Sequence, residues 1–229
     1  MARMQIIERP SPNHDARSAP IDMLVLHYTG MRKGAEALAR LCDPVAQVSA
    51  HYTIDEDGTI YRHVEEARRA WHAGVSYWAG ETAINARSIG IELVNPGHEF
   101  GYRPFAEPQI VSLIALGKGI LARHAIAPQR VLGHSDVAPA RKTDPGELFP
   151  WARLAADGIG LWPSAFGEAL DVTTFAAALA KFGYGVPPAV DTPLEAVITA
   201  FQRHFRPSTI DGVADDECAA ILAALIKAC

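Results

Sequence analysis

One stretch of the chain reads Val131-Leu-Gly-His-Ser-Asp-Val-Ala-Pro-Ala-Arg-Lys-Thr-Asp-Pro-Gly-Glu-Leu-Phe-Pro-Trp151. It begins as a short apolar strand, breaks at Gly133, and is then too rich in proline and glycine for regular structure. The chemically active side chains on this loop are His134, Asp136, Lys142 and Asp144. Because rigid scaffolds often hold reacting groups on such loops, we expect part of a functional site here. Its partners elsewhere in the chain are His27 and Glu92.

Three segments before this loop have strand patterns. A short apolar run over 21–27 predicts a buried strand with His27 at its carboxyl end. The run over 88–94 predicts another strand, with Glu92 in its middle. Two alternating runs within 49–64 are joined by an Asp-Gly turn, which predicts a β-hairpin.

Helical spacing of apolar residues covers 34–43 and 108–124. The resulting order is strand, helix, hairpin, strand, helix, strand. It indicates an α/β fold in which a central mixed sheet is flanked by helices. We expect residues 1–20 to form an extended, proline-rich lead-in over the surface. The α/β part of the chain is expected to end near Trp162.

The pattern changes after Pro163, where helical periodicity replaces strands. Three helices are predicted, over 171–182, 194–205 and 215–227. The sequence Thr192-Pro193-Leu194-Glu195 is typical of a capping box at the start of the second helix. We therefore expect two domains, 1–162 and a small three-helix domain over 163–229.

Charge and composition exclude several classes of function. The net charge of -5 gives no basic stripe for a nucleic acid, and no apolar run approaches the ~20 residues that span a bilayer. The first ten residues lack a signal-peptide core, so we expect a cytoplasmic protein, or a periplasmic one if a leader has been removed. The three cysteines have neither metal-type spacing nor an even number for disulfides. The oligomeric state is left open.

Three candidate residues are of the types that hold catalytic zinc. Such zinc takes three protein ligands with nitrogen or oxygen donors and keeps a fourth position for water. His27 and His134 follow predicted strands, so neighbouring strands would present them side by side. Asp144 reaches the same point if its loop turns back at Pro139. From the residues alone, the alternative that each is an ordinary hydrogen-bonded loop residue stays open.

Glu92 and Lys142 have types suited to catalysis beside a metal. Gly90 lies on the same strand face as Glu92 and leaves room for a group to approach, and a carboxylate beside an activated water is what a general base requires. An acidic residue among apolar neighbours can equally face solvent. Lys142 would be held near the metal, where a cation stabilises a developing oxyanion, although alone it is typical of a surface lysine.

Five motifs occur in order along residues 20–155. They are Leu26-His27-Tyr28-Thr29, Val48-Ser49-Ala50-His51-Tyr52, Ala70-Trp71-His72-Ala73-Gly74, Asn85-Ala86-Arg87-Ser88-Ile89-Gly90-Ile91-Glu92, and Gly133-His134-Ser135-Asp136 with Lys142-Thr143-Asp144-Pro145-Gly146. Together they resemble the type 2 zinc N-acetylmuramoyl-L-alanine amidases, relatives of T7 lysozyme and the peptidoglycan recognition proteins. The resemblance implies the fold of that family.

Matched by position, the resemblance implies that His27, His134 and Asp144 bind Zn²⁺. It implies that Glu92 is the base that activates the attacking water and that Lys142 is the electrophilic helper. The bond cleaved would be the amide between the lactyl group of N-acetylmuramic acid, 1,6-anhydro forms included, and L-alanine. The expected partners are therefore muropeptides or peptidoglycan fragments.

The remaining motif residues have less defined roles. His51 is not a family metal ligand, and we expect it to be structural. We expect the border of the substrate groove to include the four residues Trp71, His72, Asn85 and Arg87.

The C-terminal part has a resemblance of its own. Its segment 200–212 is similar to the three-helix peptidoglycan-binding-like domain, and the alternative is a module that only packs against the first domain. For the whole chain, two other functions stay open. One is a non-catalytic muropeptide recognition module, and the other is an exported wall-degrading lysin.

Overall fold

The computed structural model describes residues 6–163 and 170–229, so the first five residues of the lead-in and residues 164–169 of the C-terminal part lie outside it. Its centre is a six-stranded sheet with the order β1-β5-β4-β7-β3-β8. These strands are β1 (Ile6–Glu8), β3 (Met23–Tyr28), β4 (Tyr52–Ile54), β5 (Ile60–Arg62), β7 (Ser88–Leu93) and β8 (Val131–Gly133). β4, β7, β3 and β8 run parallel, while β5 is antiparallel to β4. The predicted mixed sheet is confirmed.

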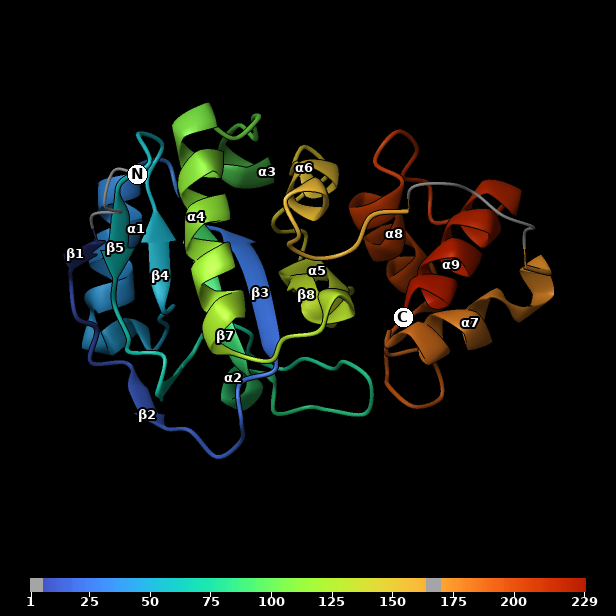
Figure 1. Cartoon of the computed structure of the whole chain (residues 1–229), viewed down its shortest axis with the longest axis horizontal. Coiled ribbons are helices and arrows are strands. Elements are labelled where there is room, and N and C mark those ends of the chain that lie inside the picture. Colours follow the sequence, from blue (N-terminus) through green and yellow to red (C-terminus); the bar gives the residue numbers. More distant parts are fainter. Residues whose placement is uncertain (1–5, 164–169) are drawn as a thin grey trace.

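Helices lie against this sheet. They are α1 (Gly34–Cys42), α2 (Ile84–Arg87), α3 (Gly97–Phe100), α4 (Glu107–Arg123), α5 (His134–Val137) and α6 (Trp151–Ala156), with single 3₁₀ turns at Pro44–Ala46 and Pro128–Arg130. Figure 1 shows α4 lying across the sheet. A Pro at the start of α4 fits the first turn, where its missing N–H has no helical partner.

The period-2 alternation of the strands separates the two faces of the sheet. Leu24 and Leu26 of β3 are buried with Ile89 and Ile91 of β7 in a cluster that includes apolar side chains of α4. Each such side chain contributes roughly 1.5–3 kcal/mol on burial. His27, one residue beyond Leu26, must point to the opposite face. The α4 face therefore forms one core. The opposite face carries a second core, which includes Val25, and it also carries His27 at the end of the strand.

The N-terminal lead-in contains strands that its sequence did not predict. β1 pairs in parallel with β5 at the sheet edge, and β2 (His14–Ala16) pairs antiparallel with β6 (Arg68–Ala70) in a second, two-stranded sheet. Each has three residues, too few to show an alternating pattern, and both are held by backbone hydrogen bonds to strands over 50 residues away in sequence. The lead-in is extended over β1 and β2, as expected, but the pairing of these two strands was not predicted.

The loop after β8 also has more regular structure than expected. His134 begins α5, a single turn of four residues, with Gly133 as its N-cap residue. The Asp136 side chain folds back to accept a hydrogen bond from the Gly133 N–H at 2.7 Å. A local hydrogen bond between a carboxylate and the backbone thus stabilises a helical turn. The proline and glycine content of the loop had led us to expect no regular structure there.

The C-terminal part forms the three predicted helices, α7 (Phe175–Phe182), α8 (Leu194–Phe205) and α9 (Asp216–Ala228), with a 3₁₀ turn at Val172–Thr174. The predicted capping box was wrong. Pro193 occupies the N-cap position of α8 and has no side-chain acceptor, so the helix begins without a side-chain cap. The cap of α9 is more regular, because Asp215 accepts a hydrogen bond from the Cys218 N–H.

One hydrophobic cluster joins the C-terminal helices to the sheet. Phe201 and Leu222 belong to the same cluster as Val25, Leu132 and Val137. Figure 1 shows α7, α8 and α9 gathered at one end of the molecule, beside α5 and β8. The division into 1–162 and 163–229 stays a prediction, and the packing shows that the two parts share a core. Within residues 6–163 and 170–229, no helix combines the length and hydropathy needed to cross a bilayer.

Candidate active site and metal centre

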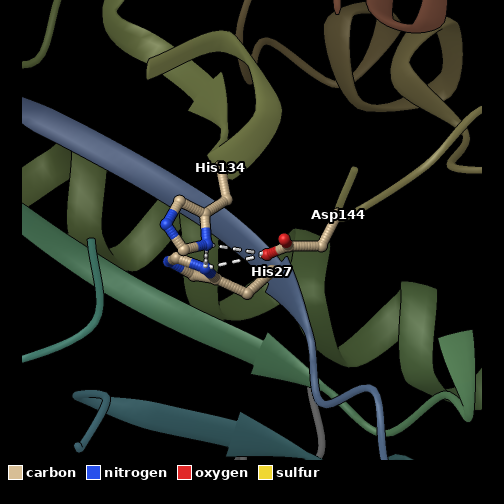
Figure 2. Close-up of side chains that lie close together, drawn as sticks. All are labelled: His27, His134 and Asp144. Atoms are coloured by element: carbon tan, nitrogen blue, oxygen red, sulfur yellow. Dashed lines mark hydrogen bonds and ion pairs between the residues drawn. The ribbon is translucent and has the colours of Figure 1, made fainter. Parts of the chain in front are cut away.

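Three side chains from distant parts of the chain converge beside the ends of β3 and β8. His27 comes from β3, His134 from the start of α5, and Asp144 from the loop that follows (Figure 2). His27 Nδ1 lies 2.9 Å from His134 Nδ1 and 3.1 Å from Asp144 Oδ2, and the latter two atoms are 3.0 Å apart. All three residues are buried. The structure thus brings together the three predicted metal ligands.

Hydrogen bonds to the outer ring nitrogens fix which nitrogen of each histidine carries its proton. His134 Nε2 lies 3.0 Å from the Ala73 carbonyl oxygen. Because a carbonyl only accepts, Nε2 is the donor, and Nδ1 of the neutral ring points its lone pair at the centre. A hydrogen bond of this kind commonly orients a metal-binding histidine.

The tautomer of His27 is set by a longer chain of hydrogen bonds. Ser88 Oγ donates to the Ile84 carbonyl at 2.7 Å, so it accepts from His72 Nε2 at 3.1 Å. His72 Nδ1 is then the acceptor for His27 Nε2, 3.0 Å away. His27 is left with its lone pair on Nδ1, directed at His134 and Asp144.

Neutral rings are what the surroundings favour. Burial, together with the His134 ring, lowers the pKa of His27 to about 4. Burial, together with the His27 and His51 rings, lowers the pKa of His72 well below its usual value.

This donor set fits a cation. In these tautomers two nitrogen lone pairs and a carboxylate oxygen face one another, an arrangement that is repulsive unless a proton or a metal cation lies between them. Ligand atoms about 2.0–2.1 Å from a tetrahedral zinc ion lie about 3.3 Å apart. Separations of 2.9–3.1 Å need to widen by only a few tenths of an ångström to admit it. His₂Asp also leaves a fourth position open, as catalytic zinc requires.

Glu92 lies beside the three predicted ligands. On neighbouring parallel strands it is the register partner of His27, and it lines the same pocket. Its Oε2 atom is buried and has no hydrogen-bond partner among the described residues. Burial and the Asp144 charge raise the pKa of Glu92 well above its usual value, and Lys142 opposes this in part. Glu92 is therefore an unusually basic carboxylate with one oxygen free to take a proton.

The pocket over the centre has a volume of ≈ 410 Å³. Lys142 and Trp71, two of the predicted site residues, line it together with His72, Glu92, His134 and Asp144. Lys142 lies close enough for its charge to lower the pKa of both His27 and Glu92. The Trp71 indole N–H donates to Asp15 of β2 at 3.3 Å, so the short N-terminal sheet holds one wall.

The other motif residues act through neighbours. Asn85 Oδ1 accepts hydrogen bonds from the backbone N–H groups of His72 and Ala73, which fixes the segment that contacts both histidine ligands. Arg87 pairs with Asp22 and Glu81 and lies outside the pocket lining. A role of Asn85 and Arg87 in binding substrate stays a prediction, because neither residue lines the pocket.

His51 lies beneath the site, as a support for the sheet. Its Nδ1 accepts from the Gly90 N–H at 2.9 Å, and its Nε2 lies 3.1 Å from the Arg68 carbonyl. It is fully buried, and burial, with the Arg17 charge, lowers its pKa to about 3. Gly90 has no Cβ, and the ring of His72 occupies the space where one would be. The group that approaches this glycine is therefore a side chain of the protein.

Sequence reasoning missed three features of the site. It did not find the contact of His72 with His27, nor the pocket-lining Arg40 and Arg141. Arg141 is anchored by hydrogen bonds to the Ala73 and Val75 carbonyls. The histidine in Trp71-His72-Ala73 was a visible signal. Arginine is common on any protein surface, and both arginines are exposed, so nothing in the sequence marked these two as site residues.

Two family models match the chain. The model for N-acetylmuramoyl-L-alanine amidase matches residues 17–147, which include all five proposed metal-binding and catalytic residues. A model for a peptidoglycan binding domain matches residues 168–222.

Similar proteins span nearly the whole chain. The N-acetylmuramoyl-L-alanine amidase AmiD of Escherichia coli is 43% identical over 232 residues, which cover 90% of this chain and 83% of the relative. A solved complex of that protein with anhydro-N-acetylmuramic acid-L-Ala-D-gamma-Glu-L-Lys superposes with a TM-score of 0.81 and covers 93% and 92% of the two chains at 40% identity. The 1,6-anhydro-N-acetylmuramyl-L-alanine amidase AmpD of Enterobacter cloacae is 36% identical over 168 residues, 64% of this chain and 87% of the relative. The chain therefore belongs to the N-acetylmuramoyl-L-alanine amidase family.

Proposed function

We propose that this chain is a zinc-dependent hydrolase of the amide between N-acetylmuramic acid and L-alanine, with 1,6-anhydromuramyl peptides among its substrates. The observation that carries the zinc assignment is the convergence of three possible ligand atoms, one each from His27, His134 and Asp144, in a buried cluster. Zinc at such a site supplies a Lewis acid that polarises a carbonyl and lowers the pKa of water.

Glu92 would act as the general base. Its buried position beside Asp144 makes it a strong base, and its Oε2 atom has no hydrogen-bond partner among the described residues. It takes the proton from the attacking water and passes it to the leaving amine of L-alanine. A positioned carboxylate of this kind contributes roughly 10²–10⁴-fold to the rate.

Lys142 would stabilise the charge that develops on the amide oxygen. It lines the pocket with its positive charge close enough to Glu92 to lower the pKa of that carboxyl. Arg40 and Arg141 line the same pocket and give it a cationic wall. Such a wall suits a stem peptide, which carries carboxylates.

The substrate class is supported by relatives. The AmiD complex holds an anhydromuramyl tripeptide, and a Pseudomonas aeruginosa relative with a TM-score of 0.81 and 35% identity was solved with an anhydromuramic pentapeptide. Because this chain is similar to both over more than nine-tenths of its length, we infer that muropeptides are its substrates as well.

The test is mass spectrometry of the products formed from purified anhydromuropeptides, with the metal content measured alongside. We expect free stem peptide and anhydromuramic sugar, abolished by a chelator and restored by zinc. Intact muropeptides with stoichiometric zinc bound would instead support a recognition module. Activity confined to polymeric wall would support the lysin alternative.

A further inference from the structure

The turn that carries one metal ligand is too short to hold its own position. α5 consists of His134–Val137, and an isolated helix of one turn is unstable because its nucleation is unfavourable. The Ser135 N–H donates to the Asp144 carbonyl at 2.9 Å, so this turn and the Asp144 loop are tied together. Whatever fixes α5 therefore fixes two of the three ligands.

The C-terminal helices supply the contacts that fix it. Asp136 is 1% exposed, and its carboxylate accepts hydrogen bonds from the Tyr184 hydroxyl at Oδ1 and from His204 Nδ1 at Oδ2, both at 2.7 Å. Tyr184 follows α7, and His204 lies in α8. Together with the Gly133 N–H, these donors satisfy a buried charge that would otherwise be costly.

The two donors are themselves held rigidly. The His204 ring stacks on Trp151 of α6 with centroids 3.7 Å apart and an interplanar angle of 19°. The Tyr184 ring packs against Trp78 at 4.8 Å. Both residues are buried, and neither belongs to the pocket over the metal centre.

We propose that Tyr184 and His204 are positioning residues for the metal centre: by holding Asp136 they fix α5, and through it His134 and Asp144. This inference rests on the zinc site of the proposed function. It gives the C-terminal helices a role in assembling the site that is separate from any contact with peptidoglycan. Partners of this kind around a metal site typically change metal affinity by 10–100-fold.

Four full-length variants test the proposal through the zinc dissociation constant, measured by competition with a chromophoric chelator. Tyr184→Phe and His204→Phe each keep a ring and remove a donor, and we expect each to weaken zinc binding about tenfold. His204→Asn keeps a donor near the Nδ1 position and loses the stacking, so it should retain more zinc affinity than His204→Phe. If His204→Phe does not fold, the milder Tyr184→Phe decides.

The matched control is Gln202→Leu. Gln202 is fully buried in α8 and bonds Asp211, Gly212 and Val213, so its loss lowers the melting temperature without touching Asp136. We expect its zinc dissociation constant to equal that of the wild type. If Gln202→Leu weakens zinc binding equally, or if both phenylalanine variants keep wild-type affinity, the positioning role of Tyr184 and His204 is wrong while the metal assignment stands. A wild-type protein that binds no zinc would overturn the metal assignment, and the positioning role with it.

Discussion

His27 of β3 and Glu92 of β7 are register partners on adjacent parallel strands, and they point to the same face of the sheet. A proposed metal ligand and the proposed base are therefore positioned by backbone hydrogen bonds between the two strands. Sites built on strands are held more precisely than sites built on loops. The other two proposed ligands come from the single helical turn α5 and the loop that follows it, which need support from elsewhere in the chain.

Replacing Glu92 by Gln keeps the shape of the side chain and removes its basicity. We expect turnover of an anhydromuropeptide to fall by roughly 10²–10⁴-fold with zinc still bound. Steady-state kinetics and metal analysis of the same preparation check this. Glu56→Gln is the control: Glu56 is a partly exposed residue of the hairpin that pairs with Arg103, and its replacement should retain wild-type turnover. Near-normal activity of Glu92→Gln would remove Glu92 from the role of base.

His72→Phe removes the acceptor for His27 Nε2 while keeping a ring in the same space. Because His27 then loses the partner that orients it, we expect the zinc dissociation constant to rise by roughly 10–100-fold. Chelator competition at fixed pH measures this. Trp71→Phe, the neighbouring residue without a contact to a ligand, is the control. Unchanged affinity in His72→Phe would show that the chain from Ser88 to His27 does not orient the ligand.

Gly90→Ala should disturb the same contact by a steric route. A Cβ at this position would lie 2.5 Å from Cγ of the buried His72 ring. We expect a loss of about 1–3 kcal/mol in the free energy of unfolding and weaker zinc binding. The double variant with His72→Ala should show little of this steric loss, since the clashing ring is gone. Gly119→Ala, on α4 beside only the flexible end of Arg123, is the control and should not destabilise the protein.

The surroundings of Glu66 lead us to expect that the free energy of unfolding depends on pH. It accepts hydrogen bonds from Tyr52, Arg123 and His124. Burial would raise the pKa of Glu66, but these partners lower it to about 2. A folded pKa below the unfolded value of about 4.5 means that the stabilisation is complete above pH 4.5 and is lost as the pH falls toward 2.

Glu66→Gln should therefore lower the free energy of unfolding by about 2 kcal/mol at pH 7, and the difference from the wild type should shrink between pH 4.5 and 2. Urea unfolding at a series of pH values measures this. The exposed neighbour Glu65 provides the control, because Glu65→Gln should change stability by less than about 0.5 kcal/mol. A difference that stays constant down to pH 2 would contradict the assignment.

The sequence predicted the elements whose patterns are local. Alternation and apolar runs gave β3, β7 and the hairpin, and the ordered motifs pointed to His27, Glu92 and His134, which the structure brings together. β1 escaped detection because its three residues are defined by pairing with β5, a partner more than 50 residues away. The hydrogen bond between Asp136 and His204 joins residues 68 positions apart in the sequence. Both are common residue types, so no local sequence pattern predicts this bond.

The cluster that joins Phe201 and Leu222 to Val25, Leu132 and Val137 bears on how such chains can evolve. A segment that carries its own core can be shuffled between genes as a cassette. Here a transplanted helical segment would have to reproduce the apolar surface opposite Leu132 and Val137 and the donors to Asp136. We therefore expect substitutions in the C-terminal helices to be coupled to substitutions in the strand and turn that hold His134, because recombination at their boundary would separate residues that share this cluster.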